Sequence, residues 1–181
     1  MGASRQSASG HAASDPAILV PTAPDVPDLI ALVNALAHEP NFLFINPIDP
    51  VSGPSAMAHH LAAISANGNE AVLIARRGAE IVGLVTGIRG AHVARRDAVE
   101  IGLGVRSECR RHGIGRALML GIERWARGMG CNRLQLRVVA ANTAAITLYT
   151  KLGFAREGVL CAAALVAGQY LDELQMAKLL F

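Results

Sequence analysis

One stretch of the chain, residues 99–129, constrains the fold more than any other, because a strand, a glycine-containing loop and a helix follow one another within it. The strand is predicted from the strict alternation of apolar residues with Glu or Gly in the run Val99, Glu100, Ile101, Gly102, Leu103, Gly104, Val105. Beyond the loop the apolar positions change to helical spacing, at Ile114, Leu118, Ile122, Trp125 and Met129. A strand that leads through a short loop into a helix is typical of a domain in which helices cover a sheet.

The rest of the chain extends this unit into one domain. Periodicity predicts three more helices, with Asp25 and Asn142 as caps of the first and last, at residues 26–38, 55–66 and 142–152. Alternation and turn residues predict six more strands, at residues 17–20, 70–75, 80–88, 134–138, 154–166 and 169–177. This order predicts an α/β (α+β) fold, with a mixed central sheet of about seven strands and helices on both faces.

Length and composition fit a single globular domain. The chain has 181 residues, of which 52% are hydrophobic, enough for one large core. Residues 1–15 lack the apolar core of a signal peptide, so we expect a flexible leader, a domain at residues 16–181 and a cytoplasmic location. No apolar run is long enough to span a bilayer, so no membrane partner is expected. The three cysteines are widely separated, which predicts neither disulfides nor a metal site.

The loop between the strand and the helix has the composition of an anion site. Gly113 and Gly115 stand at the predicted helix start, where unpaired N–H groups and the positive end of the helix dipole favour an anion. Arg110, Arg111 and Arg116 add planar cations suited to phosphate oxygens. A plain helix start would also explain the glycines. A dinucleotide-binding loop is excluded because the place of its third glycine is taken by Leu, and a P-loop because no Gly-Lys-Ser/Thr follows.

Residues 110–115, Arg-Arg-His-Gly-Ile-Gly, resemble the Arg/Gln-x-x-Gly-x-Gly/Ala signature of the GNAT superfamily of acyl-CoA N-acyltransferases. Residues 100–105, 136–142, 145–154 and 168–176 resemble other segments of that family in the same order. The resemblance implies a GNAT-like sheet splayed between its fourth and fifth strands, and acetyl-CoA as cosubstrate. The cofactor contacts that it implies are Leu103, Gly104, Val105, Arg110, Arg111, His112, Gly113, Ile114, Gly115, Arg116 and Asn142.

Two residues are candidates for the chemistry of acyl transfer. Tyr149 matches the family position of a general acid that protonates the departing sulfur, and it lies seven residues after Asn142, on the same helix face. Glu100 is the candidate base, directly or through water, because alternation places it on the same strand face as Gly102 and Gly104. A core tyrosine, an exposed strand glutamate and a plain helix cap remain alternative interpretations of Tyr149, Glu100 and Asn142.

The predicted function is N-acetyl transfer from acetyl-CoA to a primary amine, of a small molecule or a protein N-terminus, in a ternary complex. The alternative is a non-catalytic module that binds or senses acyl-CoA. Nucleic acid is not expected as a partner, because aromatic residues make up only 4% of the chain and no stacking surface is visible. Glu39, Asp49 and Glu173 are candidates for recognition of a cationic acceptor, and Phe42 and Phe44 for contact with an apolar part. A homodimer is common among similar proteins.

Overall fold

The computed structural model describes residues 16–39 and 53–181. The predicted leader at residues 1–15 and most of the predicted loop at residues 41–54, with Phe42, Phe44 and Asp49, lie outside the described residues. The strands are β1 (Ala17–Leu19), β2 (Glu70–Arg77), β3 (Glu80–Arg89), β4 (Ala98–Val105), β5 (Arg133–Val139), β6 (Ala155–Val166) and β7 (Gln169–Leu179). The helices are α1 (Val26–Ala37), α2 (Gly53–Asn67), α3 (Ile114–Gly128) and α4 (Thr143–Lys151), with short 3-10 turns at Ala23–Asp25, Val93–Arg95 and Ser107–Cys109.

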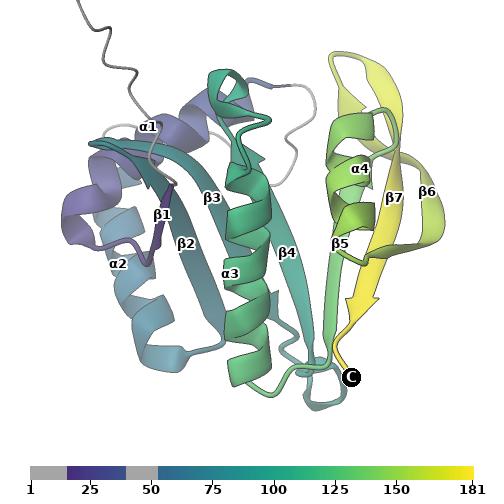
Figure 1. Ribbon diagram of the computed structural model, residues 1–181, viewed down its shortest axis with the longest axis horizontal. Coiled ribbons are helices and arrows are strands. Elements are labelled where there is room, and N and C mark those ends of the chain that lie inside the picture. The colour runs from purple at the N-terminus through teal and green to yellow at the C-terminus, as the bar shows by residue number, and fades with distance from the viewer. Residues whose placement is uncertain (1–15, 40–52) are drawn as a thin grey trace, which may run out of the picture.

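The strands form one mixed sheet in the order β1-β2-β3-β4-β5-β7-β6 (Figure 1). All neighbouring pairs are antiparallel except β4 and β5, which are parallel. The connection between these two strands is made by α3, as parallel pairing requires a long crossover. The prediction of a mixed sheet of about seven strands in a single domain is confirmed.

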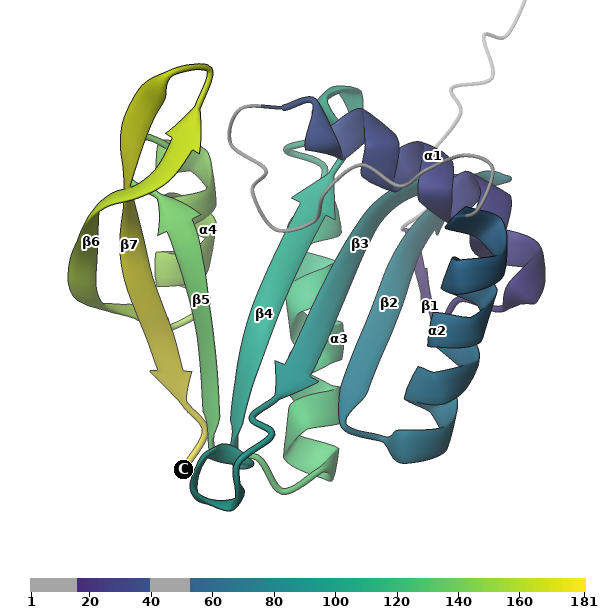
Figure 2. The same ribbon diagram turned by 180° about the vertical axis from the view of Figure 1, so that it is seen from behind.

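Helices cover both faces of the sheet, as predicted. Helices α3 and α4 lie on the face toward the viewer in Figure 1, and α1 and α2 lie on the opposite face (Figure 2). Each layer has its own core. Leu118 and Ile122 of α3 are completely buried in the first, and Leu32 of α1 and Ile74 of β2 in the second.

The sheet splits between β4 and β5. These strands pair only at one end, where Ala98, Val99 and Glu100 lie opposite Arg133, Leu134 and Gln135. From there β4 continues to pair with β3 as far as Val105, while β5 pairs with β7 as far as Val139. The two strands therefore diverge like the sides of a wedge, and the predicted splay is confirmed (Figure 1).

The two predicted helix caps have different outcomes. Asn142 caps α4, since its side-chain oxygen accepts a hydrogen bond from the Ala145 N–H at 3.2 Å. The prediction for Asp25 is wrong. A 3-10 turn precedes α1, and the Asp25 carboxylate accepts hydrogen bonds from the backbone N–H of Thr22 at 2.7 Å and from Arg76. These bonds hold the pKa of Asp25 below its usual range, with the Thr22 N–H as the largest cause, although partial burial opposes them.

Candidate active site

A cleft of about 970 Å³ opens where β4 and β5 diverge. One wall is formed by β4, the loop that follows it and the first turn of α3. The other wall is formed by the end of β5 and by α4, with Ala163 and Ala164 of β6 and Glu173 of β7 beside them. The cleft is within the usual volume range of small-molecule sites, and it contains nearly all the residues singled out from the sequence.

The first turn of α3 presents unpaired backbone N–H groups to this cleft. The first hydrogen bond of the helix runs from the Ala117 N–H to the Gly113 carbonyl at 3.0 Å, so the N–H groups of residues 114–116 have no partner within the helix. No side chain caps it, because the N-cap residue is Gly113, in the left-handed region at φ +79°. An uncapped helix start, with its positive dipole end, fits a diphosphate.

The two loop glycines have different structural roles. A Cβ at Gly113 would meet nothing within 4 Å, so this glycine is needed for its backbone conformation and leaves open space. A Cβ at Gly115 would lie 3.1 Å from Leu148 Cδ2. Gly115 therefore permits close packing between α3 and α4. From the sequence, both glycines are part of a predicted anion site, and for Gly115 the packing against Leu148 is a sufficient structural reason by itself.

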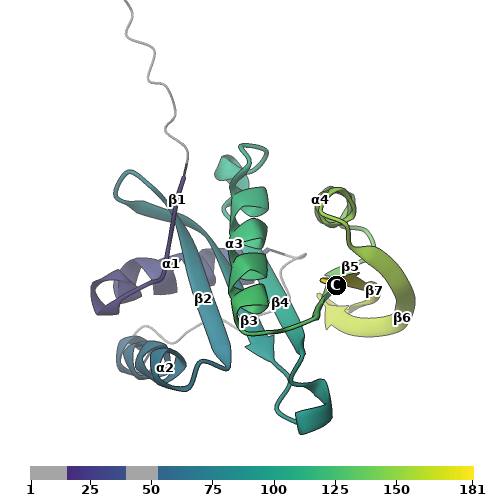
Figure 3. The same ribbon diagram turned by 60° about the horizontal axis from the view of Figure 1, so that its bottom comes forward.

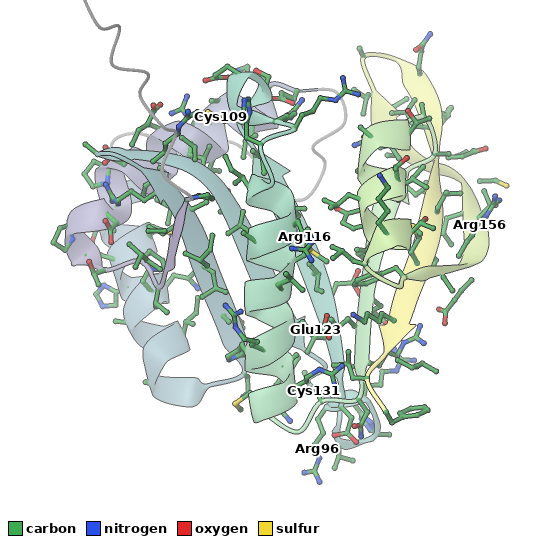
Figure 4. The ribbon with its side chains drawn as sticks, in the orientation of Figure 1. Arg96, Cys109, Arg116, Glu123, Cys131 and Arg156 are labelled. Atoms are coloured by element: carbon green, nitrogen blue, oxygen red, sulfur yellow. The ribbon has the colours of Figure 1, made fainter. Side chains whose placement is uncertain are left out.

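The cations of the loop are also not equivalent. Arg110 donates from Nε to the Val105 carbonyl at 3.0 Å and pairs with Glu39, which follows α1. It therefore joins the loop to the other layer of the molecule. Arg116 is exposed on the side of α3 that faces α4 and β5 (Figure 4). Arg111, with a φ of +65°, and His112 are exposed.

Lys151, at the end of α4, lines the cleft and is a cation that the sequence argument did not single out. Its spacing from two other lining residues, Ala144 and Thr147, is i+7 and i+4. Because residues at this spacing share one helix face, the sequence could have indicated that Lys151 faces the same side as Ala144 and Thr147.

The register of β4 decides which of its backbone groups face the cleft. The Arg106 N–H donates to the Val82 carbonyl at 2.9 Å, so by alternation the backbone of Gly104 also faces β3. The backbone groups of Leu103 and Val105 then face the diverging strand β5. No pairing between β4 and β5 continues past Glu100 in the described part of the chain. Three residues of β4 were predicted to contact the cofactor. Of these, Leu103 and Val105 turn backbone groups toward the cleft, where an extended part of a ligand could pair with them, and Gly104 does not.

Tyr149 is 6% exposed, and it lines the cleft from the inner side of α4. Its ring centroid lies 5.9 Å from that of Phe154, which fixes the ring. Burial raises the pKa of Tyr149 to about 12, so the phenol keeps its proton at neutral pH. Asn142 lies seven residues before Tyr149. Its side-chain oxygen makes the helix cap, which leaves its amide N–H₂ available as a donor.

Glu100 lies at the closed end of the cleft within a group of polar side chains. Its carboxylate accepts a hydrogen bond from Gln135 Nε2 at 2.8 Å and lies 4.0 Å from Arg137 Nε. Arg137 also lies 4.0 Å from the carboxylate of Glu173. Gln135 and Arg137 were missed by the sequence argument, because alternation along β5 shows that they share a face but not which strand they oppose.

A wedge in a mixed sheet, with an uncapped helix start at its open end and a neutral phenol inside, is the site architecture of an acyl-CoA-dependent transferase. The family model described as the acetyltransferase (GNAT) family matches residues 36–154, well over half of the chain. The chain belongs to this family of acetyltransferases. A search of curated protein sequences gave no match.

Solved structures agree with this family. The chain is similar to a GNAT-family acetyltransferase from Streptococcus pneumoniae, with 26% identity and a TM-score of 0.84 over 92% of this chain and 100% of that one. It is similar to a ribosomal-protein-alanine N-acetyltransferase from Brucella melitensis, with 29% identity and a TM-score of 0.79 over 91% and 99% of the two chains. It shares its fold with a phosphinothricin acetyltransferase from Sinorhizobium meliloti in complex with acetyl-CoA, with 21% identity and a TM-score of 0.81 over 92% and 89%.

Two further findings concern only residues 16–39 and 53–181. No helix there is long and apolar enough to cross a membrane. No three His, Cys, Asp or Glu side chains in the same residues are grouped in a way that could hold a metal ion.

Proposed function

We propose that this acetyltransferase moves the acetyl group of acetyl-CoA to a primary amine, by direct attack within a ternary complex. The observation that carries the proposal is the divergence of β4 from β5, which brings the unpaired N–H groups of α3, the open edge of β4 and the Tyr149 side chain to one cleft. These are the parts that hold a diphosphate, hold an extended thioester arm and assist a leaving sulfur.

In this proposal the chain's own residues bind the cosubstrate along the cleft. The N–H groups of residues 114–116 hold the diphosphate, with charge from Arg116 and Lys151 on the two sides. The Leu103 backbone and the Val105 N–H pair with the arm as an added strand would, while the Val105 carbonyl accepts from Arg110 Nε. The Asn142 amide donates a hydrogen bond from the opposite wall. The thioester supplies an acyl group that is already reactive, so this alignment provides much of the acceleration.

Tyr149 and Glu100 handle the protons. With a pKa of about 12, Tyr149 is a hydrogen-bond donor at neutral pH and not a base, which suits a departing thiolate. Glu100 attracts the protonated amine and receives its proton, directly or through water, at the closed end of the wedge. Its hydrogen bond to Gln135 fixes Oε2, and the acceptor would approach Oε1, which lies 4.0 Å from Arg137 Nε.

The test is CoA release over a panel of primary amines, for the wild type and for Tyr149→Phe. We expect kcat to fall about 100-fold in the variant with little change in acetyl-CoA affinity, because the ring and its packing remain. Tyr170→Phe is the matched control, since Tyr170 is 72% exposed on β7 and does not line the cleft. If no amine raises CoA release while acetyl-CoA binds, the non-catalytic alternative is correct.

The nature of the amine acceptor, a cytoplasmic location and a homodimer remain predictions. The acidic side chains Glu100 and Glu173 on the cleft support an acceptor that arrives as a cation.

A further inference from the structure

A second cavity, of about 440 Å³, lies between α1, α2 and the sheet face formed by β2 and β3. Most of its lining is apolar, and Leu29 and Val33 of α1, Met57 of α2 and Leu84 of β3 form much of the wall. Among its lining residues only His60, Glu70 and Thr86 carry polar side chains, and the first two form a pair at 3.7 Å. Its size is that of a pocket for an apolar group of moderate length.

Thr86 is the feature of this cavity that the fold does not explain. It is 9% exposed, and its hydroxyl is buried without a hydrogen-bond partner among the described residues. An unpaired buried hydroxyl costs roughly 1–3 kcal/mol, and valine would fill the same space without that cost. Thr86 also lines the cavity, so its unsatisfied hydroxyl is the polar group there that a ligand could satisfy.

The cavity adjoins the closed end of the active-site cleft. In the register of β3 and β4, Ile88 lies opposite Glu100 and Thr86 lies opposite Gly102. Opposed residues in antiparallel strands share a face and have Cα atoms about 4.5–5.5 Å apart. Ile88 and Thr86 line the cavity, while Glu100 and Gly102 line the cleft. Because Gly102 has no side chain, the residue opposite Thr86 on β4 places no side chain beside it.

We propose that this cavity binds an apolar side group of the amine acceptor, and that the Thr86 hydroxyl donates to an oxygen of the same molecule. The acceptor class is then an amine with an aliphatic or aromatic side group and a nearby carbonyl. This inference rests on the proposed function and adds the substrate class to it. The pairing of Ile88, which lines the cavity, with Glu100, which lines the cleft, favours the acceptor over an unrelated apolar ligand.

The experiment compares kcat/KM for three primary amines with saturating acetyl-CoA. Leucinamide has both features, glycinamide lacks the side group, and 3-methylbutylamine lacks the carboxamide. In the wild type we expect leucinamide to exceed glycinamide about 10- to 100-fold, which is the effect of burying one leucine side chain. Ala56→Trp, at an exposed position of α2 that lines the cavity, should reduce this ratio toward 1 without disturbing the core.

Thr86→Val tests the hydroxyl, with Thr86→Ser as the conservative variant. We expect Thr86→Val to lower kcat/KM for leucinamide about 10-fold and to leave 3-methylbutylamine unchanged, while Thr86→Ser recovers most of the loss. Acetyl-CoA affinity should not change in either variant.

The outcomes distinguish the two proposals. Equal kcat/KM for leucinamide and glycinamide in the wild type would overturn the cavity proposal and leave N-acetyl transfer intact. An equal loss for all three amines in Thr86→Val, or no response to Ala56→Trp, would also overturn it. Absence of turnover with every amine would overturn the proposed function, and this inference with it.

Discussion

The two halves of the sheet, on either side of the split between β4 and β5, are built differently. Strands β1 to β4 lie between α3 on one face and α1 and α2 on the other, and the second core belongs to this half alone. The first core, under α3, continues across the split to buried residues of β5 and β7 such as Leu134 and Met176. Strands β5 to β7 have a helix, α4, on one face (Figure 3). Strand β6 is mostly exposed along its length, including Val159 at 41% and Leu165 at 61%. The N-terminal half (β1 to β4) thus has helices on both faces of its sheet, and we call it the thick half. The C-terminal half (β5 to β7) has a helix on one face, and we call it the thin half.

The difference shows where stability and specificity lie. The first turn of α3, where we propose that the diphosphate binds, belongs to the thick half. The thin half is joined to it at the closed end of the wedge, where Lys178 of β7 donates to Glu123 of α3 at 2.7 Å and Arg127 donates to the Leu180 carbonyl at 2.8 Å. Glu123 and Arg116 lie on the same side of α3 (Figure 4), so the helix face that carries the proposed cofactor contact Arg116 also carries the connection between the two halves.

The largest expected effect tests the difference in packing. Leu118→Ala, at a residue of α3 with 0% exposure, should lower the free energy of unfolding by about 3–4 kcal/mol, through lost burial and the cavity that remains. Leu160→Ala, the same change at 38% exposure on β6, should cost less than about 1 kcal/mol. Urea denaturation measures both. Equal costs would show that the C-terminal half is as tightly packed as the other.

The second prediction concerns the cofactor end of the thick half. Gly113→Asp should weaken acetyl-CoA binding about 100-fold, or ~2.7 kcal/mol, because it places a carboxylate where the diphosphate binds. Aspartate tolerates the left-handed region and starts helices well, so the fold should persist. Gly130→Asp is the matched control at the other end of α3, with φ +70° and nothing within 4 Å. Titration calorimetry that finds equal affinities in the two variants would contradict a phosphate site here.

The third prediction concerns Tyr149 in the thin half and depends on pH. Its pKa is raised by burial from 10 to about 12, so the stability that its neutral form contributes is complete below pH 10 and is lost as the pH rises toward 12. The wild type should therefore lose about 1.4 kcal/mol relative to Tyr149→Phe for each pH unit in this window. Denaturation of both proteins at pH 9 and pH 11 measures the difference. A constant difference would show that the phenol is not desolvated.

The smallest effect tests the connection between the halves. Partial burial raises the pKa of Glu123, but hydrogen bonds from Lys178 and Arg127 outweigh it, so the pKa lies below its usual range. Glu123→Gln should lower the free energy of unfolding by about 1 kcal/mol at pH 7. A depressed carboxyl pKa gives stability that is present above the ordinary value of 4.5 and is lost as the pH falls through the depressed pKa, so the difference should shrink as the pH is lowered below 4.5.

Glu157→Gln is the control for this connection. Glu157 pairs with Arg133 inside the thin half, and its side chain is 42% exposed. Solvent screening should limit its effect to less than about 0.5 kcal/mol. If Glu123→Gln has no larger effect than Glu157→Gln, the ion pair at the closed end of the wedge does not hold the halves together.

Much of this architecture was predictable because it depends on local patterns. Alternation in residues 99–105, helical spacing after Ile114 and the cap at Asn142 are properties of short segments, and each appears in the structure as expected. The failure at Asp25 has both a local and a long-range cause. Its carboxylate turns away from α1 because Arg76, 51 residues later, and Thr22 both donate to it. Helix-capping rules consider only the neighbours in sequence.

By itself, the sequence determined the elements, their order, the anion-binding character of residues 110–116 and the family resemblance, since periodicity, glycines and motifs are encoded over short distances. The tertiary structure decided the rest. It joined Arg110 to Glu39, packed Gly115 against Leu148, turned Leu103 and Val105 toward the cleft, and buried Tyr149 so that it remains protonated. It also placed Thr86, which lines the second cavity, opposite Gly102, which lines the cleft. These facts depend on strand register and on contacts between distant residues, and a linear pattern of apolar and polar residues does not specify either.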